Sequence, residues 1–169
     1  SEIAIEEGDE VLAYAFSPGG RWLLAITDGE RAGAFLWDLA TDLSSVAAIP
    51  LENAPLPFGA VAFSPADRWL AIDDQDQPTC LWDLREPAPG GKPKQLQGHP
   101  QGDVLLRFTP DATWLTMAAA NTVYAWRLSD FLAYTFRGHE APVTTLASSP
   151  DSRQLFSASR QGGTTRLWD

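Results

Sequence analysis

The sequence contains a single cysteine among its 169 residues, so a disulfide within the chain is excluded. This scarcity fits a reducing compartment, although many exported proteins also lack disulfides. No apolar run approaches the roughly 20 residues that span a bilayer, and the chain does not open with a charged and then apolar signal segment. We therefore expect a soluble, cytoplasmic protein.

Basic residues are also scarce, because 12 Lys and Arg face 22 Asp and Glu and give a formal net charge of −10. A surface of this sign repels phosphate backbones and anionic lipid headgroups. Neither nucleic acid nor a membrane is expected as a partner. The length suffices for one domain that buries roughly 70% of the surface of the unfolded chain.

Catalytic motifs are missing as well. No G-x-x-x-x-G-K-[ST] occurs, because Gly91-Lys92 runs into Pro93 within the loop-like stretch REPAPGGKP. No G-x-S-x-G places a serine on a nucleophile elbow, and no zinc-binding cluster is present. Cys80 follows Thr79 in an apolar stretch and fits a buried, inert thiol. We expect no enzyme activity, no cofactor and no metal.

One acidic stretch, IDDQDQP, is a candidate cation site because it supplies Asp73, Asp74 and Asp76. Three carboxylates in four residues could bind calcium through oxygen ligands. The glycine at the sixth position and the distant bidentate Glu of a calcium loop are missing. We favour a solvated turn over a metal site.

An internal repeat is the main positive feature of the sequence. FLWDL, CLWDL, YAWRL and RLWD carry tryptophans at intervals of 45, 44 and 42 residues, namely Trp37, Trp82, Trp126 and Trp168. A second marker, AFSP, AFSP, RFTP and ASSP, keeps nearly the same period and ends at Pro18, Pro65, Pro110 and Pro150. Four residues after the first three prolines come Trp22, Trp69 and Trp114, whereas the fourth copy has Gln154.

Each repeat unit is predicted to consist of strands alone. Apolar runs such as VLAYAF, WLLAI and VYAW are short, rich in aromatic residues and bounded by Pro, Gly, Asp and Ser. Each Ser-Pro or Thr-Pro step suits a tight reversal between two antiparallel strands, because proline presets the first dihedral of a turn. Four strands in about 40 to 45 residues are typical of a β-propeller blade.

On these residues the sequence resembles the WD-repeat family over essentially its whole length. The Trp-Asp pairs at Trp37, Trp82 and Trp168 and the Gly-His pairs at His99 and His139 carry the resemblance, together with the four Ser-Pro or Thr-Pro turns. It implies an all-β propeller of about four four-stranded antiparallel blades.

The resemblance also implies a hydrogen-bonded set of His, Ser or Thr, Trp and Asp in each blade. The last unit offers His139, Ser157 and Trp168, with Gln161 near the Asp position. The third unit has His99 and Trp126 but Asn121, and the second has Asp76 and Trp82 but no His. We expect the complete set to be degraded in this chain.

We divide residues 1–169 into repeat units at approximately 7–51, 52–96, 97–136 and 137–169, with 1–6 as a closing strand. The start Ile3-Ala4-Ile5 resembles the fourth-strand segments that precede each new unit, so Ser1 to Glu6 is predicted to complete the C-terminal blade, in cis or in trans. Four units are few for this family. Either two chains form a ring, with a dimer favoured, or these blades belong to a longer propeller or multidomain protein.

The resemblance implies a non-catalytic protein–protein interaction scaffold, with self-assembly into a larger ring as a further expectation. The alternative is a regulatory or oligomerising propeller segment of a larger signalling or effector protein. Partner-binding candidates lie on two surfaces. The loops after the second and fourth strands of the blades supply Asp73, Asp74, His99, His139 and Arg160, and the opposite rim supplies Trp22, Trp69 and Trp114. For these tryptophans, packing over their own blades is the favoured interpretation.

Overall fold

The computed structural model describes residues 10–30, 32–41, 46–55, 58–74, 77–85, 89–97, 104–160 and 163–169, except for the side chains of Phe58 and Asp74. Within these residues all the regular secondary structure is β-strand, so the predicted all-β class is confirmed. The described part accordingly contains no helix that could cross a membrane.

The fifteen strands form four antiparallel sheets in chain order, which we call the first to fourth blades. The first blade contains β1 (Glu10–Phe16), β2 (Trp22–Asp28), β3 (Gly33–Asp38) and β4 (Ile49–Pro50). The second contains β5 (Phe58–Phe63), β6 (Trp69–Asp74), β7 (Thr79–Asp83) and β8 (Lys94–Leu96). The third contains β9 (Val104–Phe108), β10 (Trp114–Ala119), β11 (Thr122–Arg127) and β12 (Ala133–Arg137). The fourth contains β13 (Val143–Ser148), β14 (Leu155–Ser159) and β15 (Thr165–Trp168).

The predicted reversals join the first two strands of every blade, and each is held by the hydroxyl that precedes its proline. The amide of Trp22 donates to Ser17 Oγ at 2.9 Å, and the other three blades repeat this bond. The residue that turns the chain has a positive φ in each copy, at Gly20, Asp67, Ala112 and Ser152. Each hydroxyl therefore stabilises a turn that contains a residue with left-handed backbone geometry. This geometry costs more conformational energy for Asp67, Ala112 and Ser152 than for Gly20. We call the edge of the molecule that carries these turns the Ser-Pro end.

The hydrophobic core lies between blades rather than within them. One cluster joins the first and second blades and includes Leu24, Leu36, Leu70 and Trp82. A second cluster joins the second and third blades, and a third joins the third and fourth. Because each blade covers a face of its neighbour, burial in this fold depends on which neighbours a blade has.

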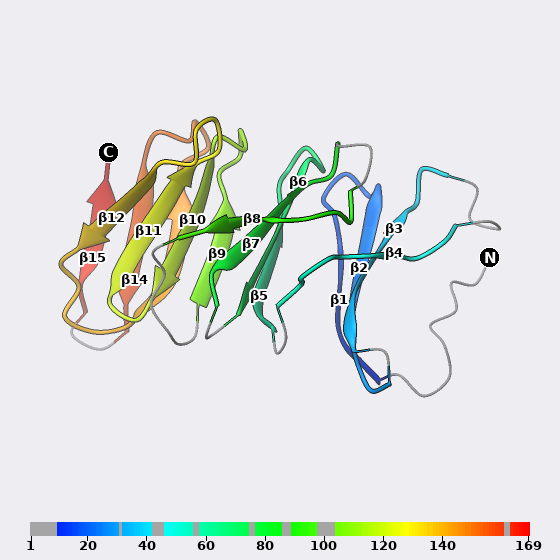
Figure 1. The fold of residues 1–169 in the computed structure, drawn as a ribbon. Helices are drawn as coiled ribbons and strands as arrows, with labels where there is room; N and C mark the ends of the chain where they lie inside the picture. Colours follow the sequence, from blue (N-terminus) through cyan, green and yellow to red (C-terminus); the bar gives the residue numbers. More distant parts are fainter. Residues whose placement is uncertain are drawn as a thin grey trace.

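The four blades stand side by side in an open row (Figure 1), with the first and fourth at opposite ends. We call the first strand of each blade its inner strand and the fourth its outer strand. The outer strands β4, β8 and β12 are each followed in the chain by the inner strand of the next blade. Among the described residues the fourth blade has three strands and no outer strand beyond β15. The predicted closing strand, Ser1 to Glu6, lies outside the described residues.

Candidate functional site

Of the partner-binding residues predicted in the loops after the second and fourth strands, some are buried and one is exposed. Asp73 ends up inside the second blade with 0% exposure, and one of its carboxylate oxygens accepts a hydrogen bond from Thr79 Oγ1 at 2.6 Å. It holds the β6–β7 connection and is not presented to a partner. Arg160 is exposed at the β14–β15 turn. His99, Asp76 and the side chain of Asp74 lie outside the described residues.

His139 is buried in the fourth blade, at 3% exposure, within a hydrogen-bonded set. Its Nε2 lies 2.7 Å from Ser157 Oγ, which also accepts a hydrogen bond from Trp168 Nε1 at 2.9 Å. Its Nδ1 lies 3.0 Å from Thr164 Oγ1. The His–Ser–Trp set expected in the last unit is therefore formed, and Thr164 also contacts the imidazole. Gln161, near the position expected for an Asp, lies outside the described residues.

The environment of His139 favours the neutral imidazole. Burial lowers the pKa of His139, because it penalises the charged form, and the positive charge of Arg166 lowers it further. Arg166 itself donates to the carbonyl of Gly138 at 2.7 Å. His139 thus fixes the β12–β13 connection against β14 and β15, which is a structural role.

Among the described residues of the other blades the same set is not formed, because the serine position differs. Ala25, Ile72 and Met117 hold the place of Ser157 in the repeat, and all three are buried and apolar. In the third blade the indole of Trp126 instead donates to the carbonyl of Gln97 at 3.2 Å. The expectation of a degraded set is confirmed for these positions.

The predicted tryptophan rim is mostly buried at the Ser-Pro end. Trp22 and Trp69 are 2% and 7% exposed and belong to the cores shared with the following blade. A guanidinium lies over each ring, with Arg21 4.7 Å from the centroid of Trp22 and Arg68 4.5 Å from that of Trp69. The favoured interpretation, packing of these side chains within the fold, describes both tryptophans.

Each of these arginines also pairs with the aspartate of the Trp-Asp pair in its own blade. Arg21 approaches Asp38 at 2.8 Å, and Arg68 approaches Asp83 at 2.7 Å. The hydrogen bond from Arg21 lowers the pKa of Asp38. The repeated aspartate therefore anchors the arginine that covers the neighbouring tryptophan, a role that the spacing of Arg-Trp and Trp-Asp in the sequence could have signalled.

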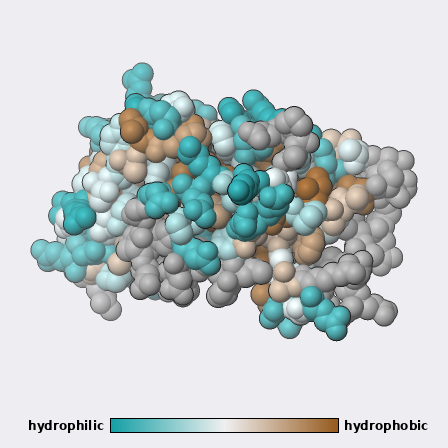
Figure 2. Space-filling view, in the orientation of Figure 1, coloured by the Kyte–Doolittle hydropathy of each residue, from teal (hydrophilic) through white to brown (hydrophobic). Residues whose placement is uncertain are grey.

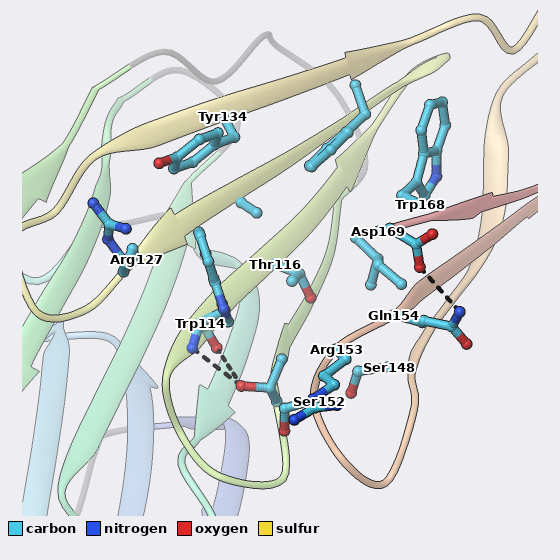
Figure 3. Close-up of a pocket in the computed structure, with 14 residues that line it drawn as sticks. Trp114, Thr116, Arg127, Tyr134, Ser148, Ser152, Arg153, Gln154, Trp168 and Asp169 are labelled. Atoms are coloured by element: carbon cyan, nitrogen blue, oxygen red, sulfur yellow. Dashed lines mark hydrogen bonds between the residues drawn. The ribbon is translucent and has the colours of Figure 1, made fainter.

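Trp114 differs from the other two tryptophans because its side chain is only partly buried. It lines a pocket of about 290 Å³ between the third and fourth blades, and Trp22 and Trp69 also line pockets at their junctions. Figure 3 shows Trp114, Tyr134 and Arg127 on one side and Trp168, Asp169 and Gln154 on the other. The rings of Trp114 and Tyr134 meet edge to face, with centroids 5.3 Å apart. Gln154 Nε2 donates to Asp169 Oδ1 at 2.9 Å.

The other junctions show which side chains lie at this place in the repeat. Leu84 follows Asp83 and joins the core around Trp22, and Leu128 follows Arg127 and joins the core around Trp69. Phe131 adds an edge-to-face contact with Trp69, at 6.2 Å between centroids. At these two junctions the apolar side chains complete the packing against the tryptophan of the preceding blade.

The described residues contain no group of three or more His, Cys, Asp or Glu side chains that could hold a metal ion. Cys80 is buried at 3% exposure, between the first and second blades. The polar side chains that are buried in these blades make structural hydrogen bonds, as Asp73 and His139 do. This arrangement offers surfaces for packing and recognition.

Four consecutive antiparallel sheets, each with a Ser-Pro or Thr-Pro turn at the same place, define a repeat protein of β-propeller blades. The family model described as "WD domain, G-beta repeat" matches residues 131–169. The other three blades carry the same turn and the same strand order. Residues 131–169 therefore match the WD-repeat family, as the resemblance of the sequence predicts, and the fold of the chain is that of β-propeller blades.

The relatives named below resemble stretches of different length in this chain. WD repeat and HMG-box DNA-binding protein 1 of Mus musculus is 38% identical over 84 residues, which are 43% of this chain and 7% of that protein. Small ribosomal subunit protein RACK1y of Oryza sativa subsp. japonica is 32% identical over 119 residues, 64% of this chain and 33% of that protein. Pre-mRNA-processing factor 17 of Homo sapiens is 20% identical over 164 residues, 94% of this chain and 28% of that protein. The chain spans a third or less of each relative.

Proposed function

We propose that the chain is a non-catalytic protein–protein interaction scaffold built from WD repeats. The observation that carries this proposal is that the side chains of the chain with the greatest chemical reactivity have structural roles. His139, Asp73 and Cys80 are all buried between or within blades. What the blades offer to other molecules is a rigid frame with connections of differing sequence, and loops on such a frame commonly carry recognition.

The relatives support the same proposal. Their names place one in the small ribosomal subunit and another in pre-mRNA processing, and a third is called a DNA-binding protein. For this chain we propose a protein partner, without nucleic acid or membrane, because its net charge is −10. A partner with a basic surface suits that charge, since complementary potentials raise association rates and select partners.

Arg160 is the predicted contact residue that is both described and exposed, so it provides the test. A partner captured from cell extract and then purified should bind equally well with and without a chelator. Arg160→Glu should weaken binding about tenfold, or about 1.4 kcal/mol, whereas Arg85→Glu, an exposed control outside the predicted contact surface, should not. Binding that is lost on chelation, or hydrolysis of the captured partner, would contradict a non-catalytic scaffold.

A second candidate is a regulatory or oligomerising propeller segment of a larger signalling or effector protein. It is favoured by the small part of each relative that the chain covers. We also propose that the scaffold reaches a larger ring by adding blades to this row. Its location is proposed to be cytoplasmic, on the scarcity of cysteine and the acidic composition, and cell fractionation tests that.

A further inference from the structure

The two lysines of the chain line the same groove. Among the 12 basic residues only Lys92 and Lys94 are lysines, and both are exposed. They line a groove of about 360 Å³ between the second and third blades, together with Trp69, Leu81 and Phe131. Figure 2 shows mostly hydrophilic side chains over the middle of the molecule, where β8 lies in the same view (Figure 1). An acidic chain thus gathers part of its scarce positive charge at one place.

The charge of these lysines is not balanced by a nearby carboxylate. Within the part of the chain that the structure describes, neither lysine forms a salt bridge. Asp83 lines the groove but already pairs with Arg68 at 2.7 Å. Asp130, next to the aromatic wall of the groove, pairs with Arg127. The described groove therefore carries a positive charge, in a chain whose net charge is −10.

The floor of the groove is apolar. Leu81 is 1% exposed and Trp69 is 7% exposed, and both belong to the core shared by the second and third blades. The ring of Phe131 meets Trp69 edge to face, and Lys94 Nζ lies 3.9 Å from the centroid of Phe131. An ammonium group on an aromatic ring keeps its charge while its stem covers apolar surface. The groove therefore combines an apolar floor with a cationic rim.

Close packing holds the loop that carries Lys92. The carbonyl of Gly90, two residues earlier, accepts a hydrogen bond from the amide of Glu52 at 2.8 Å. A Cβ at Gly90 would collide with the carbonyl oxygen of Pro50 and with Ile49. A side chain does not fit there unless β4 moves. The loop is therefore fixed against the outer strand of the first blade.

The facing wall is held in a strained conformation. Phe131 has a φ of 60°, which is costly for a bulky side chain and is common at ligand-binding positions. Its amide donates to the carbonyl of Arg127 at 2.7 Å, and the ion pair of Arg127 with Asp130 stabilises the same turn. Both walls are thus ordered before a ligand arrives, which lowers the entropic cost of binding.

We propose that this groove binds an acidic peptide segment of a protein partner. An apolar side chain of the segment would cover the floor, and its carboxylates would face Lys92 and Lys94. Charge complementarity favours this occupant. An inorganic anion would leave the apolar floor uncovered, and a nucleic acid would be repelled by the net charge of −10. The inference rests on the proposed scaffold function and adds a second contact, at the other end of the blades from Arg160.

A random peptide library displayed on phage and selected on the intact chain tests the proposal. Peptides in which aspartate or glutamate flanks a large apolar residue should be enriched over the starting library. The same selection on a chain with Lys92→Glu and Lys94→Glu should not enrich them. Enrichment of basic peptides, or of none, by the wild-type chain would overturn an acidic segment as the occupant.

Fluorescence anisotropy of an enriched peptide then locates its site. The Lys92→Glu, Lys94→Glu variant should bind it about tenfold more weakly or worse, because like charges would then meet. Lys92→Arg with Lys94→Arg keeps both charges and should bind within about twofold. Arg160→Glu, a charge reversal at the other end of the blades, should leave binding unchanged. Loss of binding in Arg160→Glu but not in the lysine variant would overturn the groove as the site.

Phe131→Gly tests the aromatic wall separately. The change removes the ring, and glycine adopts a positive φ at little cost, so the chain should keep its circular dichroism spectrum. Peptide binding should weaken about tenfold, as it does when an interface loses an aromatic anchor. Unchanged binding would overturn the role of the apolar floor and its aromatic wall. If no peptide is enriched but a captured partner still depends on Arg160, the scaffold function stands and the groove proposal alone fails.

Discussion

The first and third junctions differ although the same repeat builds both. At the first, the Asp67 carboxylate of the second blade accepts hydrogen bonds from the amides of Gly19 and Arg21, at 2.8 and 3.3 Å. The indole of Trp22 also donates to the carbonyl of Asp67 at 3.1 Å. At the third, Ser152 holds the place of Asp67 and its hydroxyl accepts one hydrogen bond, from the amide of Asp111 at 3.3 Å.

Packing differs in the same direction. Trp22 is 2% exposed with Leu84 in the same core, whereas the side chain of Trp114 is only partly buried. The comparison shows that the position of a residue in the repeat determines which face of its blade the side chain points to. The neighbouring blade determines how deeply that side chain is buried. One repeat motif can therefore give a tight junction or a loose one.

The largest expected effect tests the packing contrast. Trp22→Ala should lower the free energy of unfolding by about 3–5 kcal/mol, because it removes a large side chain that is 2% exposed in the core. Trp114→Ala should cost less, about 1–2 kcal/mol, because that ring is only partly buried. Urea unfolding followed by circular dichroism measures both. Equal losses would contradict the difference between the two junctions.

The next effect concerns the polar bridge at the first junction. Asp67→Ala should lower the free energy of unfolding by about 1–3 kcal/mol, because it leaves two amide donors without their carboxylate. Ser152→Ala is the matched change at the third junction and should cost about 0.5–1.5 kcal/mol. If Ser152→Ala proves the more damaging in thermal melts, the ranking of the two junctions is wrong.

A smaller effect comes from His139, whose pKa is lowered from 6.5 by burial and by Arg166. Below pH 6.5 the unfolded chain binds more protons at this site than the folded chain, so stability falls as the pH drops from 6.5 toward the folded pKa. Above 6.5 the contribution is complete. Melting midpoints between about pH 5 and 8 should show this loss.

Variants of the two histidines assign that pH dependence. His139→Gln should remove the decline below pH 6.5, whereas His99→Gln, which changes the other histidine, should retain it. A decline that persists in His139→Gln would place the titrating group elsewhere.

The smallest effect is at Asp111, in the turn at the third junction. Burial alone would raise its pKa, but hydrogen bonds from Thr113, Thr109 and Ser152 outweigh it and lower the pKa from 3.8 to about 2. Its contribution to stability is present above pH 3.8 and is lost as the pH falls toward about 2. Asp111→Asn should flatten the acid limb of the melting curve in this range. An unchanged limb would exclude Asp111 as its source.

The sequence predicted what the repeat itself determines. The period, the strand class and the turns at the four prolines follow from residue types at fixed spacing, and the structure confirms them. The resemblance to the WD-repeat family implied the His139–Ser157–Trp168 set, which the structure also confirms. Each is a local property, or one of neighbouring strands within a blade.

Properties that depend on how side chains pack around one another were harder to predict. Asp73 was expected at a loop surface, but at the end of β6 it turns inward to Thr79. The different exposure of Trp22 and Trp114 has no local signal, because the side chains that cover the first come from another repeat. The roles of Asp67 and Thr164 were missed because other copies of the repeat do not require them.

The shared order of strands has a consequence for how such chains change their length. Each blade is completed by the segment that leads into the next, so one repeat period contains both the end of one sheet and the start of another. Recombination that inserts or deletes a whole period would leave every turn and strand pairing in register. Blade number can therefore change without any strand pairing being redesigned. The new junction joins blades that were not neighbours before, so sequence divergence, rather than topology, limits which blades can become neighbours.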